Sequence, residues 1–373
     1  MTANSSYAAA GVDTRAGDRA VELMKEAVAK THGPNVLGGV GGFAGLFDLS
    51  FAKHYAKPLL ATSTDGVGTK IAIAQALDKH DTIGQDLVGM VVDDIVVVGA
   101  KPLFMTDYIA CGKVVPERIA TIVTGIARAC AETGTALVGG ETAEHPGLMG
   151  VDDYDVAGAA VGVVEADRLL GAERVRDRDA VIAIASSGLH SNGYSLVRHI
   201  LTGRQVDYAD QSADLGATWG EALLEPTRLY SGPLVRLLEN ERLGASVHSL
   251  SHVTGGGIAA NLARVLPPGS WAEIDRATWS PAPVFRVLSD LAGTSLESAE
   301  GTWNLGIGFL AIVEADAAAD VIAELGALGL PAWQAGTVAV GPLPRGDAPD
   351  DRWEQGAKGV DGGAVRLVGS YAS

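Results

Sequence analysis

The sequence predicts a mixed α/β protein of two domains, and three observations support this prediction. A chain of 373 residues is longer than one hydrophobic core usually organises. Strand-like and helix-like segments alternate in both halves. Apolar residues make up 47% of the chain and charged residues 20%, which is an ordinary globular composition. The expected division is a first domain over 1–170, a second over 171–345 and a loose tail over 346–373, with the boundary in the charged segment 166–179.

In the first half, hydrophobic periodicity predicts a helix over 20–30, which Gly33 and Pro34 terminate. Residues 116–132 predict another helix, with a proline in its first turn. The apolar run 86–100 is ambiguous, because its β-branched residues favour a strand and its length favours a buried helix. Segments rich in β-branched or alternating residues predict four strands, over 58–64, 103–110, 135–140 and 153–165.

The second half alternates in the same way, so both halves are predicted to be mixed α/β. The predicted strands are 180–186, 246–250, 271–275 and 306–313, and the predicted helices are 192–201, 256–266, 283–291 and 315–328.

Charge and cysteine content restrict the class of partner. The formal net charge of −17 disfavours nucleic acid or an anionic membrane as the main partner. Cys111 and Cys130 cannot form a disulfide framework and suit a reducing compartment. The first residues lack the features of a signal peptide, and no uncharged apolar stretch reaches the ~18 residues of a membrane span. A cytoplasmic protein is therefore expected, while the charge alone says little about small-molecule ligands.

Two glycine-rich stretches are candidates for phosphate binding. In STDGVGTK (63–70), a strand ends on an aspartate, two glycines and a lysine, which predicts a metal–nucleotide site. A Walker A loop is absent, because Thr69 separates Gly68 from Lys70. GGVGGFAG (38–45) contains a G-x-G-x-x-A pattern, but it follows a helix rather than a strand, so we reject a Rossmann fingerprint. It is either a plain surface loop or a glycine-rich flap that approaches phosphate oxygens.

Acidic residues recur at predicted strand ends and inside the apolar run, and together they predict a Mg²⁺ site. A single one of them could equally cap a helix or stabilise a turn. No spacing typical of zinc ligands occurs among the eight histidines. The acids are Asp48, Asp65, Asp93, Asp94 and Glu141.

The second half contains two polar glycine turns, SSGLHSNGYS (186–195) and HVTGGG (252–257), each between a predicted strand and a predicted helix. His190, Ser191 and Asn192 would stand at a helix N-terminus, where an anion is stabilised. A structural role for each histidine is the alternative. The pair of loops favours a phosphorylated substrate, and no G-x-S-x-G elbow suggests acyl transfer.

Ten motifs occur in the order found in one family, and the chain therefore resembles the phosphoribosylformylglycinamidine cyclo-ligases, also called aminoimidazole ribonucleotide synthetases. The resemblance spans roughly residues 7–338. It implies two α/β domains, the first dimerising through its strands, an ATP site without a Walker motif, and a helix over 86–100. In VVDD, Asp94 matches the acid of the family and Asp93 is additional. The motifs are YAAAGVD, GGFAGLFDL, STDGVGTK, DLVGMVVDDIVVVGAKPLFMTDYIA, GGETAEHPGLMG, DYDVAG, SSGLHSNGYSLVR, EPTRLY, HVTGGG and TWNLGIG.

The resemblance implies ATP and Mg²⁺ as cofactors, formylglycinamidine ribonucleotide as substrate, and a homodimer. The formyl oxygen is activated by the γ-phosphate of ATP and the imidazole ring then closes. The implied catalytic residues are Lys25, Asp65, Asp94 and His190, of which the histidine is a candidate for proton transfer. The implied nucleotide-binding residues are Gly41, Gly42, Asp48, Gly66, Gly68, Thr69, Lys70 and Glu141. The implied substrate-binding residues are His190, Ser191, Asn192, Thr254, Gly255 and Gly256. The implied metal ligands are Asp48, Asp65, Asp94 and Glu141.

Two alternatives remain open from the sequence. One is another ATP-dependent phosphoryl-transfer enzyme of the same fold, of the thiamine-phosphate kinase or selenophosphate synthetase type. The other is a non-catalytic dimeric nucleotide sensor, which the full set of acids disfavours.

Overall fold

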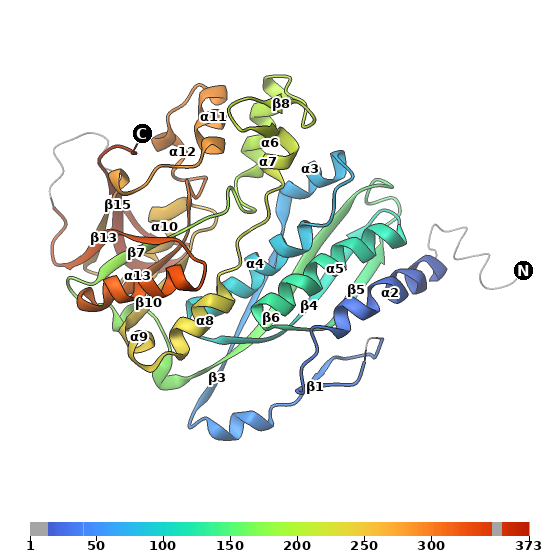
Figure 1. The fold of residues 1–373 in the computed structure, drawn as a ribbon, viewed down its shortest axis with the longest axis horizontal. Helices are drawn as coiled ribbons and strands as arrows, with labels where there is room; N and C mark the ends of the chain where they lie inside the picture. The colour runs from blue at the N-terminus through green and yellow to red at the C-terminus, as the bar shows by residue number, and fades with distance from the viewer. Residues whose placement is uncertain (1–13, 40, 345–352, 373) are drawn as a thin grey trace, which may run out of the picture. The chain divides into compact units, whose positions relative to one another are not determined.

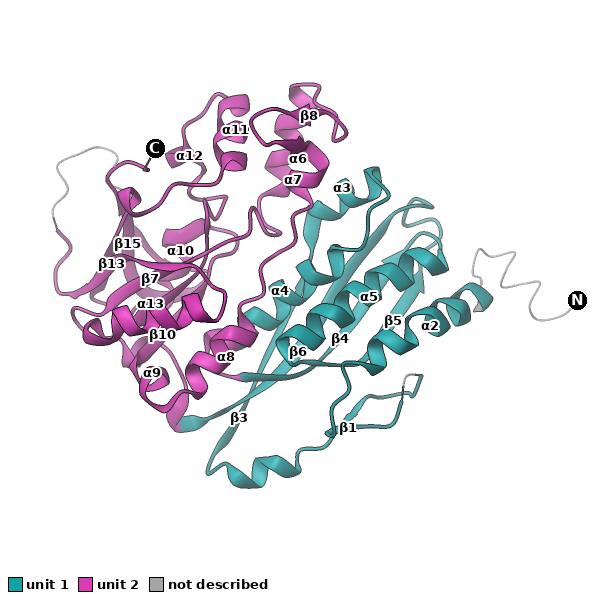
Figure 2. Ribbon diagram, viewed as in Figure 1, with its two compact units in different colours: residues 1–95, 101–166 teal, residues 96–100, 167–373 magenta. Residues whose placement is uncertain are grey.

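The computed structural model describes residues 14–39, 41–344 and 353–372. It divides the chain into two compact units, which Figures 1 and 2 show. Unit 1 comprises Met1–Ile95 and Lys101–Ala166, and unit 2 comprises Val96–Ala100 and Asp167–Ser373. The mixed α/β class predicted from the sequence is confirmed in both units.

Unit 1 is built on a four-stranded sheet, and the four predicted strands are confirmed. The strand order is β3-β6-β4-β5, in which β6 pairs antiparallel with both neighbours and β5 lies parallel to β4. The strands are β3 (Pro58–Gly66), β4 (Lys101–Cys111), β5 (Ala136–Glu144) and β6 (Tyr154–Glu165).

Helices α4 and α5 lie across one face of this sheet (Figure 1), and Ile95 of α4 lies against Gly162 of β6. The ambiguous run 86–100 forms most of α4, as the resemblance implies. Within α4, Asp94 is the only exposed residue. Burial on nearly every side explains why β-branched residues tolerate a helical backbone here. The helices of unit 1 are α2 (Thr14–Ala29), α3 (Ile71–Ala76), α4 (Ile83–Val97, which continues into unit 2) and α5 (Pro116–Thr133).

The glycine-rich stretch 38–45 connects two short strands that pair antiparallel. Val40 lies outside the described residues, as does the motif YAAAGVD. The short elements near this stretch and after β3 are β1 (Val36–Leu37), β2 (Leu46–Phe47), η1 (Ser50–His54) and η2 (Gly68–Lys70).

The two faces of the unit 1 sheet differ in burial. On the face covered by α4 and α5, Met105 and Ala160 are fully buried. On the opposite face, Leu60 is 66% exposed and Tyr108 is 42% exposed. Alternation along each strand produces this difference, because successive side chains point to opposite faces. Much of this second face, here called the open face, is therefore not covered by the described helices of unit 1.

Unit 2 contains a seven-stranded sheet with hydrophobic cores on both faces. Alternate residues of β7 show this, since Ile182 and Ile184 pack into one core and Val181 and Ala183 into the other. Burial on both faces accounts for the continuous apolar run of this strand. In sheet order the strands are β10 (Val247–His252), β12 (Ile307–Val313), β7 (Ala180–Ala185), β13 (Ala332–Val340), β11 (Ser270–Asp275), β15 (Val360–Val368) and β14 (Glu354–Ala357).

Helices α8 and α13 contribute to one core of unit 2, and α10 contributes to the other. A two-stranded ribbon, β8 (Gln211–Ser212) with β9 (Ala217–Thr218), lies outside the main sheet. The α-helices are α6 (Tyr194–Gly203), α7 (Trp219–Leu223), α8 (Ser231–Glu239), α9 (Glu241–Ser246), α10 (Gly257–Ala263), α11 (Pro283–Ala292), α12 (Leu296–Ala299) and α13 (Ala318–Ala327). The 3₁₀ turns are η3 (Ala166–Arg168), η4 (Ala172–Arg174), η5 (Arg276–Thr278) and η6 (Ala315–Ala317).

The expectation of a loose tail over 346–373 is wrong for most of its described part. Strand β15 pairs parallel with β11 and antiparallel with β14, so this segment completes the unit 2 sheet. The valine and leucine side chains of β15 explain the difference, because Val365 is fully buried in one of the cores. Separately, a search of the described residues finds no helix with the length and apolar character that a membrane span needs.

Candidate functional site

In unit 1, a cavity of about 630 Å³ lies between the glycine-rich stretch, helix α2 and strand β5. Of the predicted site residues, Gly41, Gly42 and Glu141 line it together. The structure thus brings the glycine-rich stretch and one predicted acid to the same cavity. Lys25 lies on α2, is exposed and is not among the described lining residues.

The register of the sheet shows where the acids of unit 1 point. Asp65 pairs with Gly158, and Gly158 pairs with Asp107, so both aspartates point to the face covered by α4 and α5. Glu141 pairs with Tyr108, the next residue along β4, and therefore points to the open face. Asp65 and Glu141 do not converge within one chain.

The four implied metal ligands are exposed or half-buried, whereas Asp93, the additional acid of the apolar run, is fully buried. Hydrogen bonds position two of the four ligands. Asp65 is exposed, and its Oδ1 accepts a 2.7 Å bond from the N–H of Gly66. The Oδ1 of Asp48 accepts bonds from both the Oγ (2.5 Å) and the N–H (2.8 Å) of Ser50, which lower the pKa of this carboxyl. Asp94 is exposed on α4. Among the described residues, no three histidine, cysteine or acidic side chains are grouped to hold a metal ion.

The position of the Lys70 side chain differs from the prediction. Its side chain is fully buried, and its Nζ lies 2.8 Å from Oδ1 of Asp86, which is also fully buried. The expected ammonium facing a phosphate is therefore not seen, because Lys70 opens helix α3 and points into the core of unit 1. Gly68, with a φ of 74°, and the exposed Thr69 form the turn before it. Gly66 is half-buried at the end of β3.

Asp107 is a buried acid that the sequence did not indicate, because it lies inside β4 and not at a strand end. It is 8% exposed and lines the cavity. A Cβ on Gly140 would lie 2.3 Å from its Oδ1, so only glycine at 140 leaves room for this carboxylate. Burial raises the pKa of Asp107 to about 7. A titratable acid therefore lies beside Gly140 of the neighbouring strand β5, and only its burial in the folded chain reveals it.

Replacing Asp107 with asparagine is expected to improve the stability of unit 1 at pH 8 more than at pH 5, by about 2–3 kcal/mol. The pKa is raised from 3.8 to about 7 on folding. The Asp107 carboxyl therefore ionises at lower pH in the unfolded state than in the folded state. Folding stability is lost as the pH rises from the unfolded-state pKa through the folded-state pKa. Urea unfolding of both proteins at the two pH values measures the difference. An equal effect of Asp107→Asn at both pH values would contradict the raised pKa.

In unit 2, His190 supports its loop from inside. The residue is 1% exposed and has a φ of 60°. Its Nε2 accepts a 3.2 Å hydrogen bond from the N–H of Ser187, and its ring lies 5.9 Å from that of Tyr230. Burial behind the loop makes His190 a residue that shapes the turn in this conformation, rather than one that faces a ligand.

The two predicted substrate loops of unit 2 lie next to each other. A Cβ on Gly255 would be 3.6 Å from Oδ1 of Asn192, so the tips of the two loops are in contact range. Asn192, Thr254, Gly255 and Gly256 are all half-buried, whereas Ser191 is buried, with its Oγ 3.4 Å from the Oγ1 of Thr227. Partial exposure leaves the loop tips accessible to a ligand.

Two asparagines that the sequence analysis did not single out hold these loops. The Nδ2 of Asn261 donates to the carbonyl oxygens of Gly257 (2.8 Å) and Thr254 (3.2 Å). The Nδ2 of Asn304 donates to the carbonyl oxygen of Gly188 (2.8 Å). Both side chains are buried, so their role is to fix the backbone of the loops. Asn304 belongs to the motif TWNLGIG, and that motif was the sequence signal that could have identified it.

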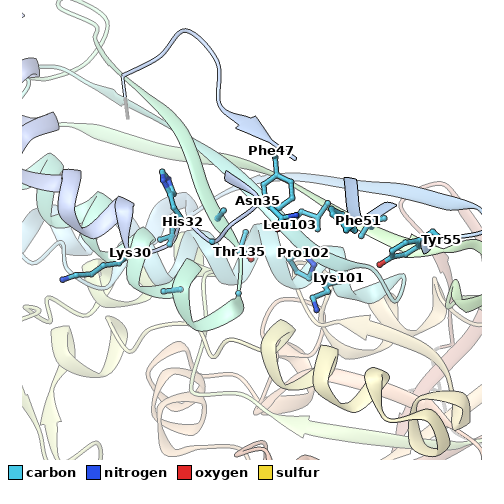
Figure 3. Close-up of a pocket in the computed structure, with 16 residues that line it drawn as sticks. Lys30, His32, Asn35, Phe47, Phe51, Tyr55, Lys101, Pro102, Leu103 and Thr135 are labelled. Carbon is cyan, nitrogen blue, oxygen red and sulfur yellow. The ribbon is translucent and has the colours of Figure 1, made fainter. Parts of the chain in front are cut away.

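A further cavity of unit 1, about 560 Å³ in volume, is shown in Figure 3. Aromatic side chains Phe47, Phe51 and Tyr55 line it, together with Lys30 and Lys101. None of the predicted site residues is among its described lining residues. The predicted chemistry is therefore not located there.

Comparison with protein families matches both halves of the chain. Residues 50–164 match the family described as AIR synthase related protein, N-terminal domain. Residues 177–346 match the corresponding C-terminal domain. The first range lies in unit 1 except for Val96–Ala100, and the second range lies in unit 2.

Among individual proteins, the phosphoribosylformylglycinamidine cyclo-ligase of Geobacillus kaustophilus is 49% identical over 337 residues, which cover 90% of this chain and 96% of the relative. A thiamine-monophosphate kinase structure from Stenotrophomonas maltophilia superposes with a TM-score of 0.64 at 20% identity, covering 94% and 96% of the two chains. A structure of the hydrogenase maturation protein HypE in complex with ATP superposes with a TM-score of 0.61 at 18% identity, covering 88% of each chain. The two structures share the fold with this chain.

Proposed function

The chain belongs to the phosphoribosylformylglycinamidine cyclo-ligase family and is an ATP-dependent ligase of purine biosynthesis, and we propose from this premise how its residues carry the reaction. The single observation that supports the assignment is 49% identity to a cyclo-ligase over 90% of the chain. The kinase alternative has only the likeness in fold, at 20% identity. The substrate is formylglycinamidine ribonucleotide and the product is aminoimidazole ribonucleotide.

The proposed chemistry activates an amide oxygen. The formyl oxygen of the substrate attacks the γ-phosphorus of ATP, ADP leaves, and an iminophosphate forms. The ribose-bearing amidine nitrogen then attacks the formyl carbon, the imidazole ring closes, and phosphate leaves. The residues of the protein have to orient the two substrates and neutralise the charge of the transferred phosphoryl group.

Unit 1 is proposed to bind ATP. The glycine-rich stretch offers backbone N–H groups without side chains, and it lies over the cavity that Glu141 also lines. The ATP complex of the HypE protein, which has the same fold, supports a nucleotide-binding role for this architecture. Lys25 is an exposed cation on the neighbouring helix and is proposed to contact a phosphate.

The acids of unit 1 fit Mg²⁺ that arrives with ATP. Mg²⁺ usually keeps several waters and binds one or two carboxylates together with phosphate oxygens, so a preformed cage of three acids is not required. We propose Asp65 and Asp94 as its ligands, because both are exposed acids of unit 1. Asp48 and Glu141 remain candidates, with Glu141 directed to the open face of the sheet. The ion would supply positive charge to the transferred phosphoryl group.

Unit 2 is proposed to bind the ribonucleotide through its two adjacent loops. Asn192 and Thr254 present polar side chains beside the glycines 255 and 256. Glycine allows backbone N–H groups to approach an anion such as the ribose phosphate. The buried His190 and Ser191 are proposed to maintain the loop that presents Asn192.

A homodimer is proposed to form through the open face of the unit 1 sheet, in the cytoplasm, where the thiols Cys111 and Cys130 remain reduced. The side chains of Leu60 and Tyr108 on this face support the proposal, because exposed apolar sheet faces mark interaction surfaces.

Arginine at Ala159, an exposed residue in the middle of β6, is expected to convert a dimer into a monomer of 38.2 kDa, because it places a charge at the centre of the proposed interface. Arginine at Ala319, which is exposed on α13 of unit 2, is the matched control and should leave the dimer intact. Sedimentation equilibrium at micromolar concentration measures both. A monomeric parent protein would rule out the proposed dimer.

The experiment that tests the proposed function compares substrates. The purified protein is incubated with Mg-ATP and either formylglycinamidine ribonucleotide or thiamine monophosphate, and ADP and aminoimidazole are both measured. One ADP for each aminoimidazole ribonucleotide, with the first substrate alone, is the expected result. ADP formation that depends on thiamine monophosphate would support the kinase alternative instead.

A further inference from the structure

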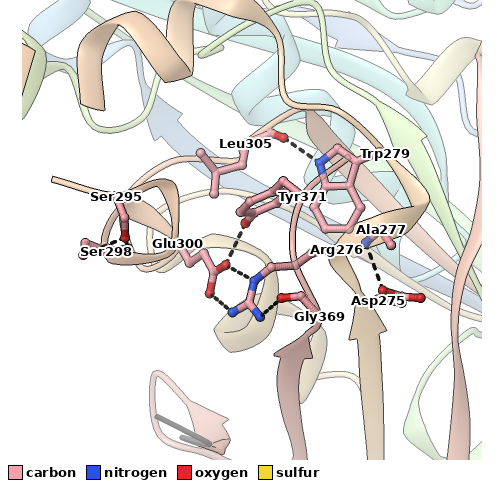
Figure 4. A network of polar contacts seen from close by, with 10 residues as sticks. All are labelled: Asp275, Arg276, Ala277, Trp279, Ser295, Ser298, Glu300, Leu305, Gly369 and Tyr371. Atoms are coloured by element: carbon pink, nitrogen blue, oxygen red, sulfur yellow. Dashed lines mark hydrogen bonds and ion pairs between the residues drawn. The ribbon is translucent and has the colours of Figure 1, made fainter. Parts of the chain in front are cut away.

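The segment 369–372, here called the latch segment, is bound to one corner of unit 2 by both backbone and side-chain contacts (Figure 4). The Nη1 of Arg276 donates to the carbonyl oxygen of Gly369 (3.1 Å), and the hydroxyl of Tyr371 donates to the Oε1 of Glu300 (2.7 Å). The N–H of Ala372 donates to the carbonyl oxygen of Trp279 (3.2 Å). The ring of Tyr371 packs edge-on against that of Trp279, with centroids 5.3 Å apart.

At the centre of these contacts is a bidentate ion pair. Arg276 donates from Nε to Oε1 of Glu300 (2.6 Å) and from Nη2 to Oε2 (2.9 Å). The two side chains are only 14% and 17% exposed. Burial, together with the adjacent Glu300 carboxylate, raises the pKa of Tyr371, so its hydroxyl stays protonated and donates. The latch segment thus adds a third hydrogen bond to a largely buried carboxylate.

Glu300 also touches one of the substrate loops. A Cβ on Gly257 would lie 1.6 Å from the carbonyl oxygen of Glu300, and Gly257 has a φ of 69°. Only glycine at 257 lets the end of the HVTGGG turn rest directly on the backbone of Glu300. A shift of Glu300 would therefore move that turn.

The residues that follow Glu300 contact the other loop. A Cβ on Gly193 would lie 2.5 Å from the ring of Trp303, which is 2% exposed. The next residue, Asn304, donates to Gly188 as described above. The segment 300–304 is thus a common support for both loops, and the latch segment holds its first residue.

We propose that the latch segment positions the two substrate loops through Glu300, so that Tyr371 and Arg276 are positioning residues for the ribonucleotide. This inference rests on the proposed function of the loops. Neither side chain has to touch the substrate. Their effect is on the affinity for the ribonucleotide and not on that for ATP, because every contact in this chain of support lies in unit 2.

The test replaces Tyr371 with phenylalanine, which keeps the ring against Trp279 and removes only the hydroxyl bonded to Glu300. The KM for the ribonucleotide is expected to rise roughly 3–10-fold, with the KM for ATP within about twofold of the parent value. Tyr371→Ala, which also removes the ring, should raise the KM for the ribonucleotide further. Lys358→Asn, in the exposed turn between β14 and β15, is the matched control and should leave both KM values unchanged.

Thermal unfolding of each variant distinguishes positioning from general stability. A lower melting temperature for Tyr371→Phe with an unchanged KM for the ribonucleotide would contradict the positioning role of the latch segment while leaving the proposed function intact. Equal increases in both KM values would also overturn it. A parent protein that does not turn over the ribonucleotide would contradict the proposed function itself and, with it, the positioning role of the latch segment.

Discussion

Replacing Lys70 with methionine is expected to lower the free energy of unfolding of unit 1 by about 3–5 kcal/mol, because it leaves the carboxylate of Asp86 buried without its cation. Both side chains are fully buried, and the Nζ–Oδ1 distance is 2.8 Å. Methionine keeps most of the side-chain volume, so the loss reports the charge rather than a cavity. The same variant would also lose activity, since Lys70 ends the STDGVGTK turn.

The design of this measurement follows from the distribution of tryptophan. All six tryptophans lie in unit 2, so their fluorescence reports that unit, and amide hydrogen exchange in residues 83–95 of α4 reports unit 1. The double variant Lys70→Met, Asp86→Leu should recover much of the lost stability, because it removes both charges of the buried ion pair together. The matched control is Lys79→Met, whose ion pair with Asp81 is about half exposed and should contribute less than about 1 kcal/mol. Equal losses for Lys70→Met and Lys79→Met would show that the buried pair is not structural.

Replacing Asp65 with asparagine is expected to reduce kcat/KM with Mg-ATP by about 30–1000-fold, which corresponds to about 2–4 kcal/mol of transition-state stabilisation. Asparagine keeps the oxygen that accepts the 2.7 Å bond from Gly66, so the end of β3 should keep its conformation. The negative charge proposed to hold Mg²⁺ is removed. Excess Mg²⁺ should therefore restore part of the rate.

Steady-state turnover across a range of Mg²⁺ concentrations measures this effect, and circular dichroism checks the fold. Asp152→Asn is the matched control in unit 1, because Asp152 is an exposed acid that is not among the predicted ligands. If Asp65→Asn turns over at the parent rate at every Mg²⁺ concentration, Asp65 is only a turn residue.

Much of the fold could be predicted from the sequence, because burial follows periodicity. The four strands of unit 1 and the helix α5 lie where their patterns place them, and α2 begins at Thr14, six residues before the predicted start. The run 86–100 could not be decided by pattern alone, since burial on nearly all sides removes the periodic signal from α4. Strand β15 was missed because its pairing partner, β11, lies about 90 residues earlier in the chain.

The site could be predicted in part, and tertiary packing explains what was missed. The glycine-rich stretch and the loops at 186–195 and 252–257 carry local turn signals. The structure places the glycine-rich stretch at a cavity of unit 1 and the two loops in contact range of each other. The burial of Lys70 depends on Asp86, which reaches it only once α3 and α4 are packed. The high pKa of Asp107 likewise depends on burial beneath the helices, which no local pattern records.

The measurement that tests the central claim most directly follows one oxygen atom. Formylglycinamidine ribonucleotide carrying ¹⁸O in its formyl group is converted with unlabelled Mg-ATP, and the released phosphate is analysed by mass spectrometry. If the formyl oxygen attacks the γ-phosphorus before the ring closes, each phosphate released with aminoimidazole ribonucleotide contains one ¹⁸O atom. Product accompanied by unlabelled phosphate would contradict the activation of the amide by phosphoryl transfer.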